Sequence, residues 1–84
     1  MFKDYDLKGQ IAMITGAGSG IGREVSRVLA EEGAVLALVD INEAGLKKTA
    51  GLLRQTNSDC EIFKADVSDY NSITQVFKKI ENRF

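Results

Sequence analysis

Thr15-Gly16-Ala17-Gly18-Ser19-Gly20-Ile21-Gly22 contains four glycines at alternate positions. The apolar run before it, residues 11–14, predicts a strand buried on both faces, and the apolar positions after it, 21, 25, 28 and 29, share one face of a helix. Because glycine has no Cβ to hold a ligand away from the backbone, such a turn lets a pyrophosphate reach the free N–H groups and positive dipole of the helix start. The stretch therefore predicts a site for a nucleotide.

The spacing of these glycines narrows the kind of nucleotide fold. The pattern is not G-x-G-x-x-G, and no Gly-Lys-Ser/Thr follows, which excludes a Walker phosphate loop. What remains is T-G-x-x-x-G-x-G, preceded by Leu7-Lys8-Gly9-Gln10 and a four-residue apolar run. In these residues the sequence closely resembles the short-chain dehydrogenase/reductase family, which opens with a leucine, a basic residue and a glycine, then a strand and this glycine pattern. A glycine-rich loop with no ligand is the alternative.

The resemblance implies a fold, a reaction and a set of cofactor contacts. The fold is α/β, a three-layer Rossmann-type doubly wound parallel sheet, of which this chain would form the N-terminal half in the order β-α-β-α-β-α. The reaction is the interconversion of a small-molecule alcohol and a ketone by hydride transfer, with NAD as the cofactor. The implied cofactor-binding residues are Gly16, Ser19, Gly20, Ile21, Gly22, Asp40, Ile41, Asp66 and Val67.

Asp40 ends a second apolar run, residues 34–39, which is typical of a parallel strand covered on both faces. It lies about eighteen residues after the glycine loop, close to the ~20 at which a dinucleotide fold places an acid on the adenosine ribose. A carboxylate there accepts hydrogen bonds from the ribose hydroxyls and repels a 2′-phosphate. Ser19 and Ile41 stand where NADP-using relatives tend to carry Lys or Arg, which favours NAD. The alternatives are a solvated strand end or a helix cap in competition with Asn42.

A third expected strand, residues 61–66, ends in Asp66 and is followed by Val67. In the family that the sequence resembles, this Asp-Val pair lies over the adenine, where the carboxylate takes the exocyclic amine and the valine packs on the ring. The alternative for Asp66 is a cap of the last helix, although Ser68 and Asp69 lie nearer to the expected start of that helix.

Helices are expected between and after these strands. The first covers residues 21–32 and ends at Gly33 in the left-handed conformation. The second is capped by Asn42 and is apolar at positions 46, 50 and 53, and the third is apolar at positions 73, 76, 77, 80 and 84. Alternating strands and helices imply a parallel sheet, and right-handed crossovers then give the spatial order third, second, first strand.

The length of the chain, 84 residues, is below the ~100 to 150 of a usual single domain. Phe84 is still in phase with the last helix, so we expect residues 1–84 to be a truncated N-terminal part of a dinucleotide-binding domain. The resemblance places Asn-Ala-Gly, a catalytic serine and Tyr-x-x-x-Lys beyond it. Tyr5 is followed four positions on by Gly9 and Tyr70 by Thr74, so we expect no catalytic residue in this chain and no activity from it alone.

Composition excludes several other classes. Eleven basic and 12 acidic residues give a net charge of −1, so there is no electrostatic case for a nucleic acid or an anionic membrane as partner. Residues 1–6 lack the apolar core of a signal peptide, and no apolar run approaches the ~20 residues that span a bilayer, which predicts a cytoplasmic protein.

Histidine is absent, and no metal site is expected. The single cysteine, Cys60, is expected to be an incidental exposed thiol in a polar turn.

Two other function classes stay open at this point. A methyltransferase that uses S-adenosylmethionine also places glycines after its first strand and acids after its second and third. Its glycine loop, however, normally opens with an acidic residue where this chain has Ile14-Thr15. A non-catalytic nucleotide-binding module is the second alternative.

A homo-oligomer is also expected, since the first strand would have no pairing partner on its far side within these residues. An unpaired apolar strand edge is a template for another chain. We therefore expect self-association through this strand and the last helix, or an exchange of elements with a second copy of the chain.

Overall fold

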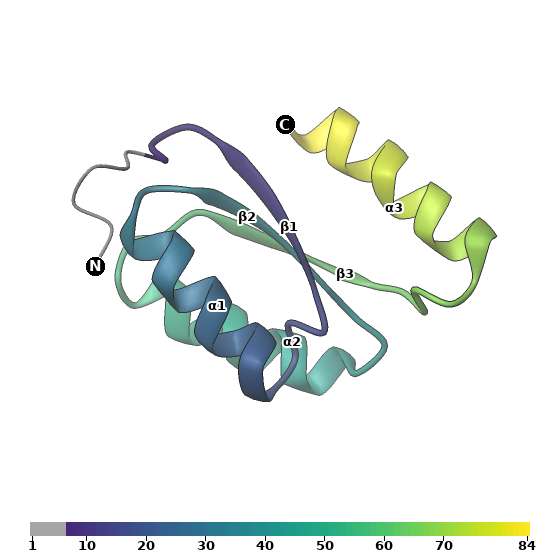
Figure 1. Ribbon diagram of the computed structural model, residues 1–84, viewed down its shortest axis with the longest axis horizontal. Helices are drawn as coiled ribbons and strands as arrows, with labels where there is room; N and C mark the ends of the chain where they lie inside the picture. Colours follow the sequence, from purple (N-terminus) through teal and green to yellow (C-terminus); the bar gives the residue numbers. More distant parts are fainter. Residues whose placement is uncertain (1–6) are drawn as a thin grey trace.

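The computed structural model describes residues 7–84, in which strands and helices alternate as expected (Figure 1). The elements are β1 (Ile11–Thr15), α1 (Gly20–Glu31), β2 (Val35–Asp40), α2 (Glu43–Arg54), β3 (Cys60–Lys64) and α3 (Tyr70–Arg83). Residues 1–6, where the sequence shows no signal-peptide core, lie outside the described part.

The three strands form one parallel sheet in the order β1-β2-β3, so the predicted order is confirmed. Ile11 lies opposite Val35, and Leu36 lies opposite Cys60. Helices α1 and α2 cover one face of the sheet and α3 covers the other, which gives the three layers (Figure 1). Because the strands are parallel, their carboxyl ends meet at one end of the sheet, where open α/β sheets bind ligands.

The central strand β2 is buried on both faces, as its continuous apolar run predicts. Successive side chains of a strand point to opposite faces. Leu36 and Leu38 accordingly pack in the core under α1 and α2, whereas Ala37 and Val39 pack in the core under α3, and all four have no exposed surface. The buried run ends at Val39, and Asp40 is the last residue of β2.

Helix α1 packs only in part through the face that the sequence predicted: Leu29 packs against the core, but the N-terminal half of that face is exposed. Ile21 is 83% exposed and Val25 is 40% exposed, whereas Ser26 is fully buried and donates its hydroxyl hydrogen bond to the Gly22 carbonyl (2.7 Å). An added Cβ on Gly22 would overlap the carbonyl oxygen of Gly16. The prediction was wrong for Ile21 and Val25 because the smallest residues, rather than the most apolar ones, let the first turns of α1 approach the strand-to-helix loop.

Cys60 also departs from the expectation. It lies in β3 rather than in a polar turn, and it is 3% exposed. Its side chain belongs to the core between the sheet and α2, and burial raises the pKa of the thiol. Cys60 is therefore a small core residue, a common role for a free cysteine.

Capping side chains fix the starts of α2 and α3. The Asn42 side chain accepts a hydrogen bond from the Gly45 N–H (3.0 Å), so the predicted cap of α2 is confirmed. Asp69 caps α3 by accepting the N–H of Asn71 (3.0 Å). Gly33 follows α1 with φ of 92°, the left-handed conformation expected for it.

Apolar surface remains exposed on β1 and α3. Within residues 7–84 the outer side of β1 pairs with no strand, and Ile11 is 48% exposed. In α3, Val76 is buried, but Phe77 is 50% exposed. None of the helices in this part of the chain has the length and apolarity needed to cross a membrane.

Candidate cofactor-binding site

The glycine loop follows β1 at the carboxyl end of the sheet. Gly16 and Gly20 have φ of 69° and 52°, a left-handed conformation that glycine adopts without the strain of a Cβ. Between them, Ala17 is fully buried and donates its N–H to the Val39 carbonyl (3.1 Å). The loop is thus anchored to β2, while Gly16 and Gly20 remain exposed beside the start of α1.

The N-terminus of α1 differs from those of the other two helices. Ser19 occupies the cap position with an extended φ of −167°, but its side chain makes no capping hydrogen bond, and the first turn of α1 carries no acidic residue. The first N–H groups of a helix have no partner within the helix, and they carry a partial positive charge. This end of α1 therefore fits an anionic group such as a phosphate.

Asp40, the last residue of β2, connects the glycine loop to the start of α2. Its Oδ2 accepts the N–H of Gly18 (2.8 Å), and its Oδ1 accepts the N–H of Asn42 (3.0 Å). The N–H groups of Asn42 and Gly18 hold the pKa of Asp40 below its ordinary value, against the opposing effect of burial. The carboxylate is therefore ionised at neutral pH, and it keeps acceptor positions for further donors. The side chain that caps α2 is Asn42 rather than Asp40. The two backbone hydrogen bonds also distinguish Asp40 from a strand end that contacts only solvent.

Asp66 lies just beyond β3 and is exposed. Its Oδ1 accepts both the hydroxyl (2.6 Å) and the N–H (2.9 Å) of Ser68, which lower the pKa of Asp66. Because Asp69 caps α3, the helix-cap alternative does not apply to Asp66. Its carboxylate is held at the carboxyl end of the sheet with acceptor capacity to spare.

A hollow of about 130 Å³ brings many of the expected residues together. Its lining residues are Gly16, Asp40, Ile41, Ala65, Asp66 and Val67. Ile41 is 62% exposed and Val67 is 52% exposed, so two apolar side chains stand in water beside two carboxylates. This combination suits a ligand with an apolar ring and with hydroxyl or amine donors.

The remaining expected residues lie on the adjoining loop and helix start. Ser19, Gly20 and Ile21 are exposed there. Gly22 has a packing role instead, because an added Cβ would overlap the Gly16 carbonyl oxygen. Gly22 thus lets the loop and α1 come together rather than facing the hollow itself.

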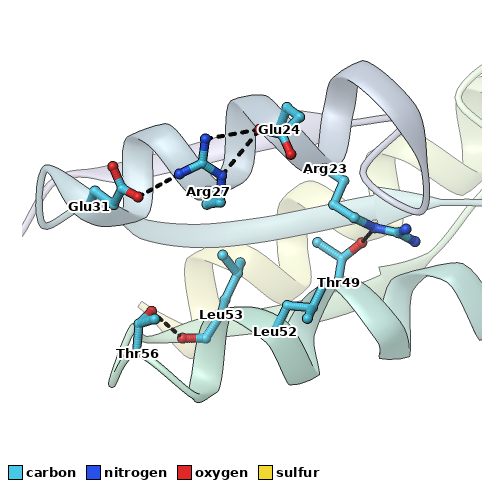
Figure 2. A pocket seen from close by; sticks show the side chains of 8 residues that line it. All are labelled: Arg23, Glu24, Arg27, Glu31, Thr49, Leu52, Leu53 and Thr56. Carbon is cyan, nitrogen blue, oxygen red and sulfur yellow. Dashed lines mark hydrogen bonds and ion pairs between the residues drawn. The ribbon is translucent and has the colours of Figure 1, made fainter. Parts of the chain in front are cut away.

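Sequence reasoning missed a hydrogen-bond network behind the loop. Arg23 donates from Nη2 to the Gly18 carbonyl (2.6 Å) and from Nε to Thr49 Oγ1 (2.8 Å), and the Thr49 hydroxyl donates to the Ala17 carbonyl (2.7 Å). Figure 2 shows Arg23 reaching from α1 to Thr49 on α2. Thr49 falls within the apolar spacing of Leu46 and Leu53, and a polar residue at such a buried position needs a hydrogen-bond partner. The polar Thr49 at this position was therefore the one signal in the sequence for the network.

A larger hollow, about 210 Å³, lies between α1 and α2 (Figure 2). It is lined by Arg23, Glu24, Arg27, Glu31, Thr49, Leu52, Leu53 and Thr56, and it shares none of these residues with the smaller hollow. The carboxylates and exposed apolar side chains expected of a cofactor site line the smaller hollow, at the carboxyl ends of the strands.

Residues 10–84 match the short chain dehydrogenase family. The chain belongs to the short-chain dehydrogenase/reductase family. The match covers the loop, both strand-end acids and all three helices, and it agrees with the fold and the function that the glycine pattern implied. It favours an oxidoreductase over a methyltransferase as the class of protein.

Relatives in this short-chain dehydrogenase family are longer than the chain. A 2,3-dihydro-2,3-dihydroxybenzoate dehydrogenase from Bacillus subtilis is 43% identical over 75 residues, which are 89% of this chain and 29% of that enzyme. The structure of a citronellol catabolism dehydrogenase from Pseudomonas aeruginosa has a TM-score of 0.89 and 30% identity, over 92% of this chain and 32% of that one.

A short-chain dehydrogenase/reductase from Burkholderia phymatum, solved in complex with NAD, has a TM-score of 0.84 and 32% identity, over 89% of this chain and 27% of that one. The chain thus spans less than a third of the length of each of these three relatives.

Proposed function

We propose that this chain binds the adenosine diphosphate half of NAD and that the whole protein is an NAD-dependent oxidoreductase. The observation that carries the proposal is the carboxylate of Asp40, which two backbone N–H groups hold beside the start of α1, where no side chain caps the helix. A ribose diphosphate needs these two features next to each other: an acceptor for its hydroxyls and a site for its phosphates.

In this proposal the hollow and the adjoining loop and helix start contact different parts of the cofactor. The pyrophosphate lies at Gly16, Gly20, Ile21 and the start of α1, which the packing of Gly22 makes accessible. The ribose lies between Ser19 and Asp40, and the adenine lies between Ile41 and Val67, with its amine near Asp66. The exposed apolar side chains of Ile41 and Val67 support the adenine position, since burying them against a ring removes apolar surface from water.

The choice of NAD over NADP rests on charge. Asp40 is a fixed negative charge where a 2′-phosphate would sit, and neither Ser19 nor Ile41 supplies a cation for that phosphate. The NAD complex of the relative from Burkholderia phymatum supports the same choice. We propose that the whole protein transfers hydride between NAD and a small alcohol or ketone in the cytoplasm. Residues 1–84 alone are expected to be inactive.

Titration calorimetry of the 84-residue chain tests the binding proposal. NAD and ADP-ribose should bind with similar, weak affinities, because the chain lacks the groups expected to grip the nicotinamide. A preference for NAD of more than ~1.4 kcal/mol, a tenfold ratio, would mean that the nicotinamide pocket is misplaced. Heat from S-adenosylmethionine but not from ADP-ribose would favour the methyltransferase alternative.

We also propose a homo-oligomer. The unpaired edge of β1, which carries the exposed Ile11, and the exposed Phe77 of α3 support it. Light scattering of the 84-residue chain across a dilution series should give a mass above that of one chain at micromolar concentration, with the mass falling on dilution. A folded monomer that persists at high micromolar concentration would contradict self-association.

A further inference from the structure

Gly18 is held from two sides. Its N–H donates to Asp40 Oδ2 (2.8 Å), and its carbonyl accepts from Arg23 Nη2 (2.6 Å). An added Cβ on Gly18 would lie 2.7 Å from the same Asp40 oxygen, so the loop and the carboxylate are in close contact. The position of Asp40 is therefore linked to Arg23 through a single residue of the glycine loop.

Arg23 is itself fixed from α2. Its Nε donates to Thr49 Oγ1 (2.8 Å). Thr49 is fully buried, and its hydroxyl donates a hydrogen bond to the Ala17 carbonyl (2.7 Å). An added Cβ on Gly45 would overlap the Gly18 carbonyl oxygen, so α2 also contacts the loop directly. Charged donors make the stronger hydrogen bonds, which makes the guanidinium the main restraint on the Gly18 carbonyl.

The hydrogen bond from Arg23 to Gly18 restrains the part of the loop that contacts Asp40, where the adenosine ribose would lie. Both oxygens of Asp40 accept backbone N–H groups, those of Gly18 and Asn42. A 2′-phosphate could be admitted only if this carboxylate turned away, and turning away would break the bond to Gly18. A loop that Arg23 holds in place therefore opposes that movement.

We propose that Arg23 is a positioning residue that determines the preference for NAD over NADP by holding Gly18, and through it Asp40, in place. The inference rests on the proposed function. Arg23 acts on the carboxylate from behind the loop and does not itself contact the cofactor.

The neighbouring arginine provides a matched control. Arg27 lies one turn further along α1 and pairs with Glu24 (3.0 Å) and Glu31 (2.6 Å) at the surface (Figure 2). Arg23 and Arg27 carry the same charge on the same helix, but Arg27 bonds to carboxylates of α1 rather than to the glycine loop. Replacing each arginine by methionine keeps much of the length of the side chain and removes the guanidinium.

The experiment measures the dissociation constants of NAD and NADP for the whole protein that carries this chain. Arg23→Met should lower the ratio of NAD to NADP affinity by about tenfold, the size of one hydrogen bond to a charged group. Arg27→Met should leave the ratio unchanged. A purely structural role would weaken both cofactors by the same factor, and an unchanged ratio in Arg23→Met would overturn the proposal.

Two further variants keep the test decisive. If Arg23→Met does not fold, Thr49→Val removes the acceptor that fixes Arg23 and should lower the same ratio, whereas Thr49→Ser keeps the hydroxyl and should not. An equal ratio in both Thr49 variants would also overturn the proposal. Asp40→Ala separates the two claims: if it changes the ratio and the Arg23 and Thr49 variants do not, only the role of Arg23 fails. If Asp40→Ala changes nothing, the proposed function fails as well.

Discussion

Replacing Gly22 with alanine is expected to destabilise the chain by about 1 to 3 kcal/mol, the usual cost of forcing an extra methyl group into a packed site. The new Cβ would overlap the Gly16 carbonyl oxygen and lie 3.1 Å from the Ala17 Cα. Both neighbours are backbone atoms in a loop that is anchored to β2, so they cannot move aside as the end of a side chain could. The midpoint of urea unfolding, at an unchanged slope, measures the effect.

Gly51→Ala is the matched control for this prediction. Gly51 lies inside α2, and an added Cβ would meet nothing within 4 Å. Alanine is the better helix former by roughly 0.5 to 1 kcal/mol, so this variant should be more stable than the natural sequence. Equal shifts of the unfolding midpoint in the two variants would show that Gly22 has no special packing role.

Asp40→Ala is expected to relax the preference for NAD over NADP in the whole protein. The change removes the acceptor proposed for the ribose hydroxyls and the negative charge that repels a 2′-phosphate. A hydrogen bond to a charged group contributes about 1.5 to 3 kcal/mol, so NAD affinity should fall by roughly tenfold or more while NADP affinity falls less or rises. Equilibrium titration with each cofactor measures both affinities.

Two comparison variants isolate the cause. Asp40→Asn keeps one acceptor oxygen but removes the charge, so it should recover part of the NAD affinity and still admit NADP. Asp59→Ala removes an exposed carboxylate that pairs with Arg83 (3.2 Å) and lies outside the hollow, so it should alter neither affinity. If Asp40→Ala behaves like Asp59→Ala, the assignment of NAD loses its main support.

Local patterns in the sequence were sufficient for the fold. The alternation of apolar strands with helices predicted a parallel sheet, and the handedness of the crossovers predicted its order. Asn42 and Gly33 carry residue types whose capping chemistry acts within a few positions, and both were placed correctly. Such signals depend on near neighbours in the chain, which is why they can be read without a structure.

Contacts between distant segments account for what the sequence did not predict. The exposure of Ile21 depends on how closely Gly22 approaches Gly16, and periodicity alone does not report that distance. Cys60 was expected in a turn because polar residues precede it, but its pairing with β2 makes it a core residue. The bond from Arg23 to Thr49 joins residues 26 positions apart, and no local pattern links them.

The most direct test is a crystal structure of the whole protein grown with NAD. The account predicts the pyrophosphate at the N-terminus of α1 and the adenosine ribose hydroxyls within hydrogen-bond distance, about 2.6 to 3.2 Å, of the Asp40 carboxylate. The adenine should lie between Ile41 and Val67. A cofactor whose ribose hydroxyls face away from Asp40, or whose phosphates lie away from the Gly16–Gly22 loop, would contradict it.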